Sequence, residues 1–201
     1  EGRMVLADKL ADMPFVTVPY AKPGLPLTRE ILARIKPETQ IVVLQNHGLI
    51  VCGKSVDAVS DLLQDVENRL ALPPSKDKTA DPGSPAPEGF VWSEESWIAL
   101  DPQIADLAVT GTYYPDHVVF LGPALPVRDH DSAPPAILIK GQGILIRKDA
   151  TSSQKAMLRC LSDVLARLPA DWTVDPIGPE AEAELLNWDA EKYRQALAEQ
   201  R

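Results

Sequence analysis

The sequence predicts an α/β fold: layers of α, β and α around a mostly antiparallel sheet, with a duplicated strand-turn-strand-helix unit. Its 201 residues are 45% hydrophobic and 24% charged, which is typical of a globular chain with one large core or two small ones. Short runs rich in β-branched residues alternate with stretches of helical periodicity. The order strand, turn, strand, helix also occurs twice, and such an internal repeat indicates a duplicated supersecondary unit.

The first part of the chain predicts a helix end, a strand, a helix and two further strands. Residues 3–12 resemble the end of a helix, and FVTVPY reads as a short strand. Thr28 is expected to cap a helix through REILARI that ends at Lys36 and Pro37. TQIVVLQN and GLIVCG then both predict buried strands.

A further helix is predicted after these strands. Ser55 is expected to be its N-cap, and Asp57 is favourable in its first turn. Apolar residues then recur at steps of three and four, which places them on one helix face: Val56, Val59, Leu62, Leu63, Val66 and Leu70.

A Pro-rich linker over residues 73–89 is expected to separate two parts, residues 1–72 and residues 90–201. The linker is dominated by Pro, Ser, Gly and charge, a composition that buries little apolar surface. Beyond it, Asp101 is expected to cap a helix with Pro102 at its first position. HVVFLGP, AILIK and GILIR predict three strands, and a helix from Ser152 and a charged helical tail follow.

The two parts align with each other. Once the first strand is trimmed by one residue, VVLQNHGLIVCGKSV matches ILIKGQGILIRKDAT, so residues 46–48 fall on residues 141–143 and His47 falls on Gln142. A strand, FVTVPY or HVVFLGP, is expected upstream of each copy. Residues 90–201 therefore read as a second, degenerate repeat unit with a helical tail.

Charge and hydropathy limit the classes of partner. A net charge of -9 argues against nucleic acid or an anionic membrane surface, so an anionic substrate would need a local basic pocket. The apolar runs are far shorter than the roughly 20 residues of a membrane span, and the N-terminal residues do not resemble a secretion signal. Cys52 and Cys160 lie in apolar segments without metal-type spacing, so we expect buried free thiols in a reducing cytosol and a cytoplasmic protein.

One motif has two interpretations. Gly48, Gly53, Lys54 and Ser55 fit G-x-x-x-x-G-K-[ST], the signature of a phosphate-binding loop. The four residues between the glycines, LIVC, favour extended structure, and the second copy of the repeat lacks the motif. A β-hairpin is therefore favoured over a phosphate loop, which stays open as an alternative.

The histidine of the turn stands alone in sequence. His47 has no H-x-H or H-E-x-x-H partner, and a lone turn histidine is more often structural than a ligand. His117, at the start of HVVFLGP, is likewise either a structural residue or part of a second functional site. Residue types alone leave both alternatives open.

A family resemblance adds to this picture. VVLQNHGLIVCGKSVDAVSDLLQDVENR resembles the strand-NHG-strand-helix segment of the class II aldolase and adducin family, which includes fuculose-phosphate and rhamnulose-phosphate aldolases and ribulose-phosphate 4-epimerase. GTYYPDHVVFLGP is similar to a stretch downstream of the aldolase part of long rhamnulose-phosphate aldolases fused to a short-chain dehydrogenase. This sequence contains no Gly-rich dinucleotide fingerprint.

The resemblance implies a function and a metal site. It implies a zinc-dependent lyase of carbohydrate metabolism that cleaves a small sugar phosphate or related hydroxy-carbonyl compound through a zinc-stabilised enediolate. His47 would be a zinc ligand, Asn46 would orient the turn, and Gly48 would let the backbone pass close to the metal. A small-molecule substrate and a homo-oligomer are implied as well.

The rest of the family's site has no counterpart in this sequence. The family's His-x-His pair and its catalytic carboxylate precede the NHG segment, and residues 1–45 contain no His. The resemblance therefore assigns no catalytic residue here and implies the C-terminal part of a longer enzyme. The alternative is a metal-free, adducin-like scaffold or oligomerisation module in which His47 is structural.

Overall fold

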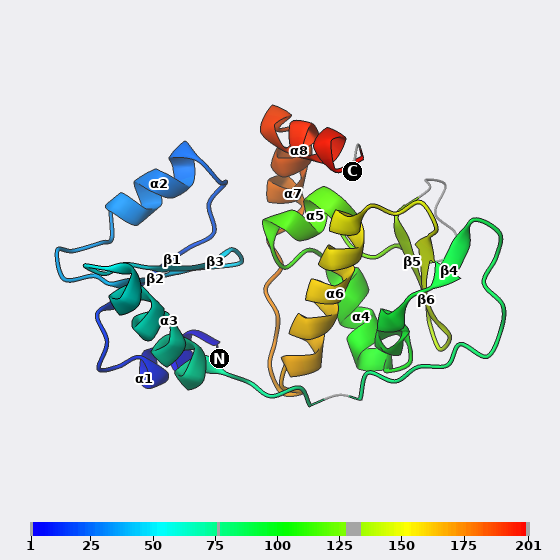
Figure 1. Cartoon of the computed structure of the whole chain (residues 1–201), viewed down its shortest axis with the longest axis horizontal. Coiled ribbons are helices and arrows are strands. Elements are labelled where there is room, and N and C mark those ends of the chain that lie inside the picture. The colour runs from blue at the N-terminus through cyan, green and yellow to red at the C-terminus, as the bar shows by residue number, and fades with distance from the viewer. Residues whose placement is uncertain (1, 76, 128–133, 200–201) are drawn as a thin grey trace. The chain divides into compact units, whose positions relative to one another are not determined.

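The computed structural model describes residues 2–75, 77–127 and 134–199 and divides the chain into two compact units (Figure 1). The first unit contains residues 1–73 together with 171–173, and the second contains residues 74–170 together with 174–201. Each unit has helices and its own three-stranded sheet, which confirms the α/β class. The strands thus form two small sheets, one mixed and one antiparallel, and not a single sheet.

The first unit has three helices and three strands: α1 (Gly2–Lys9), β1 (Phe15–Val18), α2 (Leu25–Leu32), β2 (Ile41–Leu44), β3 (Gly48–Val51) and α3 (Val56–Leu70). Its strand order is β1-β2-β3. Strand β1 runs parallel to β2, with Phe15 opposite Ile41, and β2 runs antiparallel to β3, with Leu44 opposite Gly48. Strands β1 and β3 are therefore the edges of this sheet.

Helices lie on both faces of the first sheet (Figure 1). Leu27 and Ile31 of α2 pack against one face, which is formed by Val18, Val42 and Leu44. Helices α1 and α3 lie on the opposite side (Figure 1), and Val66 is the buried residue of α3. Because successive strand residues point to opposite faces, β2 is buried from both sides.

Helix α2 begins earlier than the sequence suggested. Its N-cap is Gly24, and Pro26 lies in its first turn, where the fixed φ of proline suits a helix start. Thr28 is inside the helix, and its hydroxyl donates to the Gly24 carbonyl. The helix ends at Leu32, before Lys36 and Pro37. The predicted Thr28 cap is therefore wrong.

Strand β3 is exposed and not buried as predicted. Leu49 and Ile50 are each 37% exposed, and β3 is an edge strand that pairs with β2 on one side. Cys52 follows this edge strand and is exposed, which corrects the prediction of a buried thiol. In α3 the Ser55 cap is confirmed, since Ser55 Oγ accepts from the Ala58 N–H. Two of the expected apolar positions in α3 are exposed, Val56 at 85% and Leu63 at 37%.

The second unit contains the larger core. Its elements are β4 (Phe90–Trp92), the 3₁₀ helix η1 (Glu94–Ala99), α4 (Pro102–Thr110), α5 (Pro115–Leu121), β5 (Ala136–Ile139), β6 (Gly143–Arg147), α6 (Ser152–Arg167), α7 (Pro179–Leu186) and α8 (Asp189–Glu199). The strand order is β4-β6-β5, and both pairings are antiparallel. Residues Trp97, Ile144, Leu161 and Leu165 are among those that form the core between η1, β6 and α6.

The segment HVVFLGP forms helix α5 and not the predicted strand. Pro115 occupies its first turn, and Gly122, with φ 96°, ends it. A short apolar run is compatible with a strand or a buried helix, and here the proline and the packing of Val118 and Val119 against Leu185 select the helix. The strand upstream of the second hairpin is therefore β4, which pairs with β6.

The two hairpins close in the same way. The His47 N–H donates to the Leu44 carbonyl at 3.2 Å, and the Gln142 N–H donates to the Ile139 carbonyl at 3.0 Å. Their sheets differ, because β2 has a parallel neighbour whereas β6 has an antiparallel one. The structure thus contains two similar hairpins, while duplication and full layering stay predictions.

The predicted linker, residues 73–89, has neither helix nor strand in its described residues. Residues 74–89 nevertheless belong to the second unit and contact its other residues. The Ser75 N–H donates to the Ala166 carbonyl at 2.8 Å, Lys78 forms an ion pair with Asp163, and Ala80 packs against the core.

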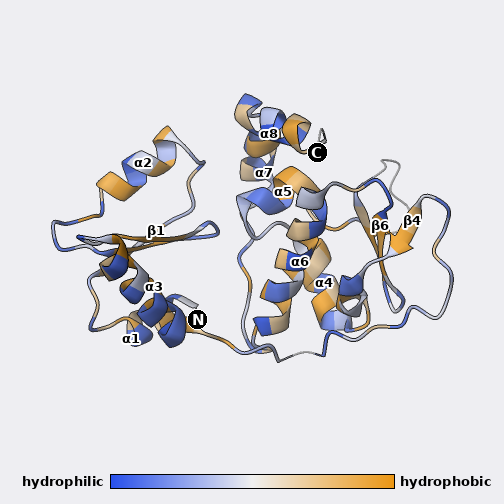
Figure 2. Cartoon of the chain, viewed as in Figure 1, coloured by the Kyte–Doolittle hydropathy of each residue, from blue (hydrophilic) through white to orange (hydrophobic). Residues whose placement is uncertain are grey.

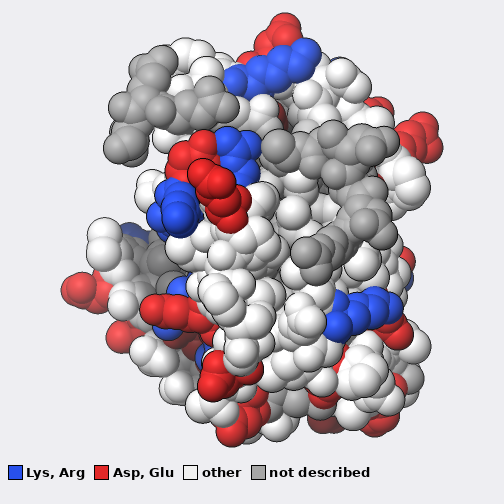
Figure 3. All heavy atoms as spheres, turned by 90° about the vertical axis from the view of Figure 1, so that its right-hand side faces the viewer, with Lys and Arg blue, Asp and Glu red and all other residues white. Residues whose placement is uncertain are grey.

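The distribution of hydrophobic and hydrophilic residues agrees with the packing of the elements. Figure 2 shows β1 and β4 as hydrophobic, whereas α3 and α6 alternate between hydrophilic and hydrophobic residues. On the face shown in Figure 3, Lys and Arg are interspersed with Asp and Glu among the described residues. Over the described ranges, none of the helices is both long and apolar enough to cross a bilayer.

Candidate functional site

The NHG turn connects two strands of the first sheet and presents His47 to solvent. Asn46 has φ 54°, a left-handed value that asparagine tolerates better than most residues, at the third position of the turn that His47 closes. Gly141 holds the same place in the second hairpin with φ 75°. The turn shape is therefore set locally, and His47 is exposed at its end.

Glycine follows the turn in both hairpins, but for different reasons. Gly48 has φ 148°, a conformation that side chains rarely adopt, and a Cβ there would meet no atom within 4 Å. Gly143 is limited by space, because a Cβ would lie 2.8 Å from Ser96 Oγ and 3.1 Å from a ring carbon of Trp92. The open space at Gly48 is consistent with the expectation that the backbone there can approach a bound group.

A hollow of about 360 Å³ begins at Gln45, the second residue of the turn. Arg3 Nη2 donates to Gln45 Oε1 at 3.0 Å, so the guanidinium of α1 lies against the turn. Thr17 and Arg34 also line this hollow, and Arg34 is paired with Glu30. No carboxylate is among its described lining residues. The hollow therefore has the basic character that an anionic substrate would require in an acidic chain.

The residues around His47 do not form a complete zinc site. A catalytic zinc ion needs three protein ligands and one open position. Within residues 2–75, 77–127 and 134–199, no group of three His, Cys, Asp or Glu side chains could hold a metal ion. His47 can supply one imidazole, and His130 lies outside the described residues. Any further ligands would have to come from beyond the described part.

The phosphate-loop alternative is wrong. Residues 48–51 form strand β3, whose backbone pairs with β2, so these N–H groups do not wrap around an anion. Ser55 caps helix α3 with its side chain.

His117 lies in the interior of the second unit, on helix α5. Its exposure is 0%, and neither ring nitrogen has a hydrogen-bond partner in the described structure. The rings of Tyr113 and Tyr114 lie beside it, with centroids 6.3 Å and 5.5 Å away. Burial lowers the pKa of His117 to about 4, so the imidazole is neutral near pH 7. This environment favours the structural interpretation of His117.

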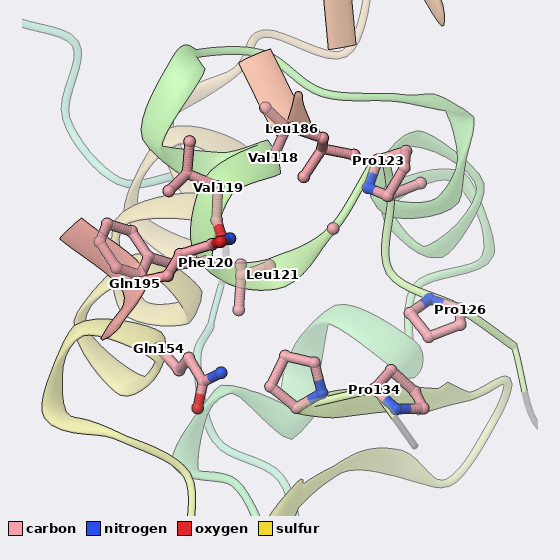
Figure 4. A pocket seen from close by; sticks show the side chains of 13 residues that line it. Val118, Val119, Phe120, Leu121, Pro123, Pro126, Pro134, Gln154, Leu186 and Gln195 are labelled. Carbon is pink, nitrogen blue, oxygen red and sulfur yellow. The ribbon is translucent and has the colours of Figure 1, made fainter. Parts of the chain in front are cut away.

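The residues after His117 line an apolar hollow of about 300 Å³ (Figure 4). Its polar side chains are two amides, Gln154 and Gln195. Gln154 Oε1 accepts from the Thr151 N–H in a capping box, and Gln195 Nε2 donates to the Val119 carbonyl. No titratable side chain is among the described residues that line this hollow, so it offers no acid or base.

Reasoning from sequence did not find Arg3 or Gln45 as neighbours of the turn. They are 42 residues apart in the chain, and α1 and β2 meet only in the folded unit. Nothing in the sequence around Arg3 indicates its contact with Gln45. The NHG motif, in contrast, marks its own turn.

Comparison with known proteins identifies the first unit. Residues 5–72 match the family described as Class II Aldolase and Adducin N-terminal domain. No curated protein and no solved structure matches the chain. The matched residues contain β1 to α3 and the NHG turn with its exposed histidine. Over residues 5–72, the chain therefore belongs to the class II aldolase and adducin family.

Proposed function

We propose that the first unit is part of a metal-dependent aldolase-type lyase that cleaves a small sugar phosphate or a related hydroxy-carbonyl compound. The observation that carries this proposal is the family match over residues 5–72, which includes the NHG turn. His47 is proposed as one zinc ligand. In such enzymes a bound zinc ion acts as a Lewis acid that stabilises the enediolate left by carbon-carbon cleavage.

The residues of this chain would position the metal ligand and the substrate. The hydrogen bond from the His47 N–H to Leu44 and the left-handed Asn46 hold the turn, so that the imidazole projects from a rigid hairpin. Arg3 would bind the anionic end of the substrate in the hollow that begins at Gln45. The remaining metal ligands and the carboxylate that moves the proton would come from outside the described residues.

The proposal includes a setting for this activity. A cytoplasmic location agrees with Cys52 and Cys160, both of which are free thiols. A homo-oligomer acting on a small-molecule substrate is proposed from the family resemblance.

Zinc analysis of the full-length gene product tests the role of His47. The sharpest variant is His47→Gln, because glutamine already occupies the equivalent turn position as Gln142 and the fold should tolerate it. We expect stoichiometric zinc in the unaltered protein, its loss in the variant, and an unchanged midpoint of thermal unfolding when both are metal-free. Gln142→Ala is the matched control in the other hairpin and should keep its zinc. Zinc retained at full stoichiometry in His47→Gln would refute the assignment.

The second candidate is a non-catalytic, adducin-like scaffold or oligomerisation module. It is favoured by β3, an edge strand on which Leu49 and Ile50 are each 37% exposed, since such edges often pair with other chains. The same experiment separates the two candidates. A metal-free full-length protein whose stability and assembly do not change in His47→Gln would support the scaffold.

A further inference from the structure

A separate hollow of about 400 Å³ lies in the second unit, outside the family match. Residues from β4, η1, β6 and α6 line it. Its volume is in the range of small-molecule sites, which combine apolar walls with a few polar groups. The side chains that line it include two carboxylates and two basic groups.

The acidic side contains a largely buried glutamate that has no ion partner among the described residues. Glu95 is 8% exposed and lines the hollow, and in the described part of the chain it forms no ion pair. Glu94, beside it at the start of η1, is exposed and also lines the hollow. Because Glu95 lines the hollow and has no ion partner among the described residues, its negative charge is available to a cationic ligand there.

The basic side is one face of helix α6. Lys155 and Arg159 are four residues apart, so their side chains are neighbours on the helix surface. Both are exposed, both line the hollow, and neither forms an ion pair within the described ranges. The two signs of charge thus line one hollow of about 400 Å³, and among the described residues no ion pair joins them.

The wall of the hollow is apolar and rigid. Trp92 Nε1 donates to the Ser84 carbonyl at 2.6 Å, and the indole ring packs over Gly143, which has no space for a Cβ. Ile146 and Leu158, which are 5% and 1% exposed, complete the apolar lining. The hydrogen bond and the contact with Gly143 hold the indole ring of Trp92 in place. The face of this ring can pack against hydrocarbon or against a cation.

We propose that this hollow binds a zwitterionic small molecule with a hydrocarbon part. Its ammonium group lies at Glu95 and Glu94, its carboxylate lies at Lys155 and Arg159, and its hydrocarbon packs on Trp92. A simple amine would be repelled by the two basic side chains, and a simple carboxylate would be repelled by the two acidic ones. The zwitterion satisfies both sides, and this site is independent of the function proposed for the first unit.

Binding of four related compounds to the full chain tests the proposal. The zwitterions are L-norleucine and 6-aminohexanoate, isomers that differ in the separation of their charges. Hexylamine and hexanoate carry only one charge on a similar hydrocarbon. By isothermal titration calorimetry at millimolar ligand, we expect one of the zwitterions to bind about tenfold or more tightly than either singly charged compound. Absence of binding by both zwitterions, or equal binding by hexylamine or hexanoate, would overturn the proposal.

Substitutions test whether the ligand binds in this hollow. Glu95→Gln keeps the shape and removes the negative charge, so the affinity for the bound zwitterion should fall about tenfold or more. Lys155→Gln, at an exposed position that the fold tolerates, should weaken binding in the same direction. The matched controls are Glu184→Gln and Lys148→Gln, which are exposed residues outside the hollow and should bind as the unaltered chain does. Unchanged affinity in both Glu95→Gln and Lys155→Gln would show that the ligand binds elsewhere.

Discussion

Buried His117 makes the stability of the second unit depend on pH. Its ring is fully buried and neither nitrogen has a hydrogen-bond partner among the described residues, so the charged form has no compensating partner there. We predict that His117→Leu, which replaces the imidazole by an apolar side chain of similar size, removes this dependence. Asp116, the sequence neighbour of His117, forms an ion pair with Arg194 that is present in both proteins.

The magnitude follows from the two pKa values. Burial lowers the pKa of His117 from 6.5 in the unfolded chain to about 4 in the folded one. Between these values the unfolded state binds more protons, so the free energy of unfolding decreases as the pH falls from about 6.5 to about 4. A shift of about 2.5 units at about 1.4 kcal/mol each corresponds to about 3.5 kcal/mol in full, of which roughly 3 kcal/mol is lost by pH 4, where half of the folded protein carries a protonated His117. Above pH 6.5 the histidine is neutral in both states and the loss vanishes.

Urea unfolding followed by tryptophan fluorescence measures this loss. Trp97 is buried in the core of the second unit and reports its unfolding. The free energy of unfolding should be determined at pH 7 and at intervals down to pH 4 for the unaltered chain, for His117→Leu and for His47→Gln, a control at an exposed histidine. Carboxylates titrate in all three, so the difference between the proteins isolates His117.

The expected result is a difference in the free energy of unfolding that grows as the pH falls. Relative to the unaltered chain, His117→Leu should gain up to about 3 kcal/mol on going from pH 7 to pH 4, while His47→Gln should run parallel to the unaltered chain. If all three proteins lose stability in parallel over this window, the reasoning from the buried imidazole is refuted.

Two further substitutions test the packing of the second unit. Gly143→Ala should destabilise it by about 1–3 kcal/mol, because the new Cβ would lie 2.8 Å from Ser96 Oγ. Gly2→Ala, where a Cβ meets nothing within 4 Å, should not destabilise the chain, and an equal loss in both would contradict the steric cause. Ser162→Ala removes the acceptor of the buried Trp97 Nε1 hydrogen bond of 2.8 Å and should cost about 1–3 kcal/mol in urea unfolding. No change in the unfolding midpoint would indicate that the indole N–H finds another partner.

Local signals in the sequence predicted several features correctly. The Ser55 and Asp101 caps are confirmed, because a cap bonds to backbone groups only two or three residues away. The turn at Asn46 and its counterpart at Gly141 are likewise local, since the left-handed backbone there favours these two residue types.

Features that depend on distant neighbours were predicted poorly. HVVFLGP matched a strand as well as a helix, and packing against α7 is one of the reasons that it is a helix. Apolar GLIVCG was expected to be buried, but β3 is an edge strand whose residues Leu49 and Ile50 stay exposed, because burial depends on the elements that pack on the strand. The Thr28 cap failed because Pro26 starts the helix earlier.

The sequence by itself determined the α/β class, the NHG hairpin and the family resemblance of the first unit, because each of these depends on residues close together in the chain. Tertiary structure decided which groups surround each site. It placed Arg3 beside Gln45 across 42 residues, buried His117 without a partner, and assembled Glu95, Lys155 and Trp92 around one hollow. The physical reason is that burial and charge pairing are properties of the packed neighbours, which no single segment of sequence specifies.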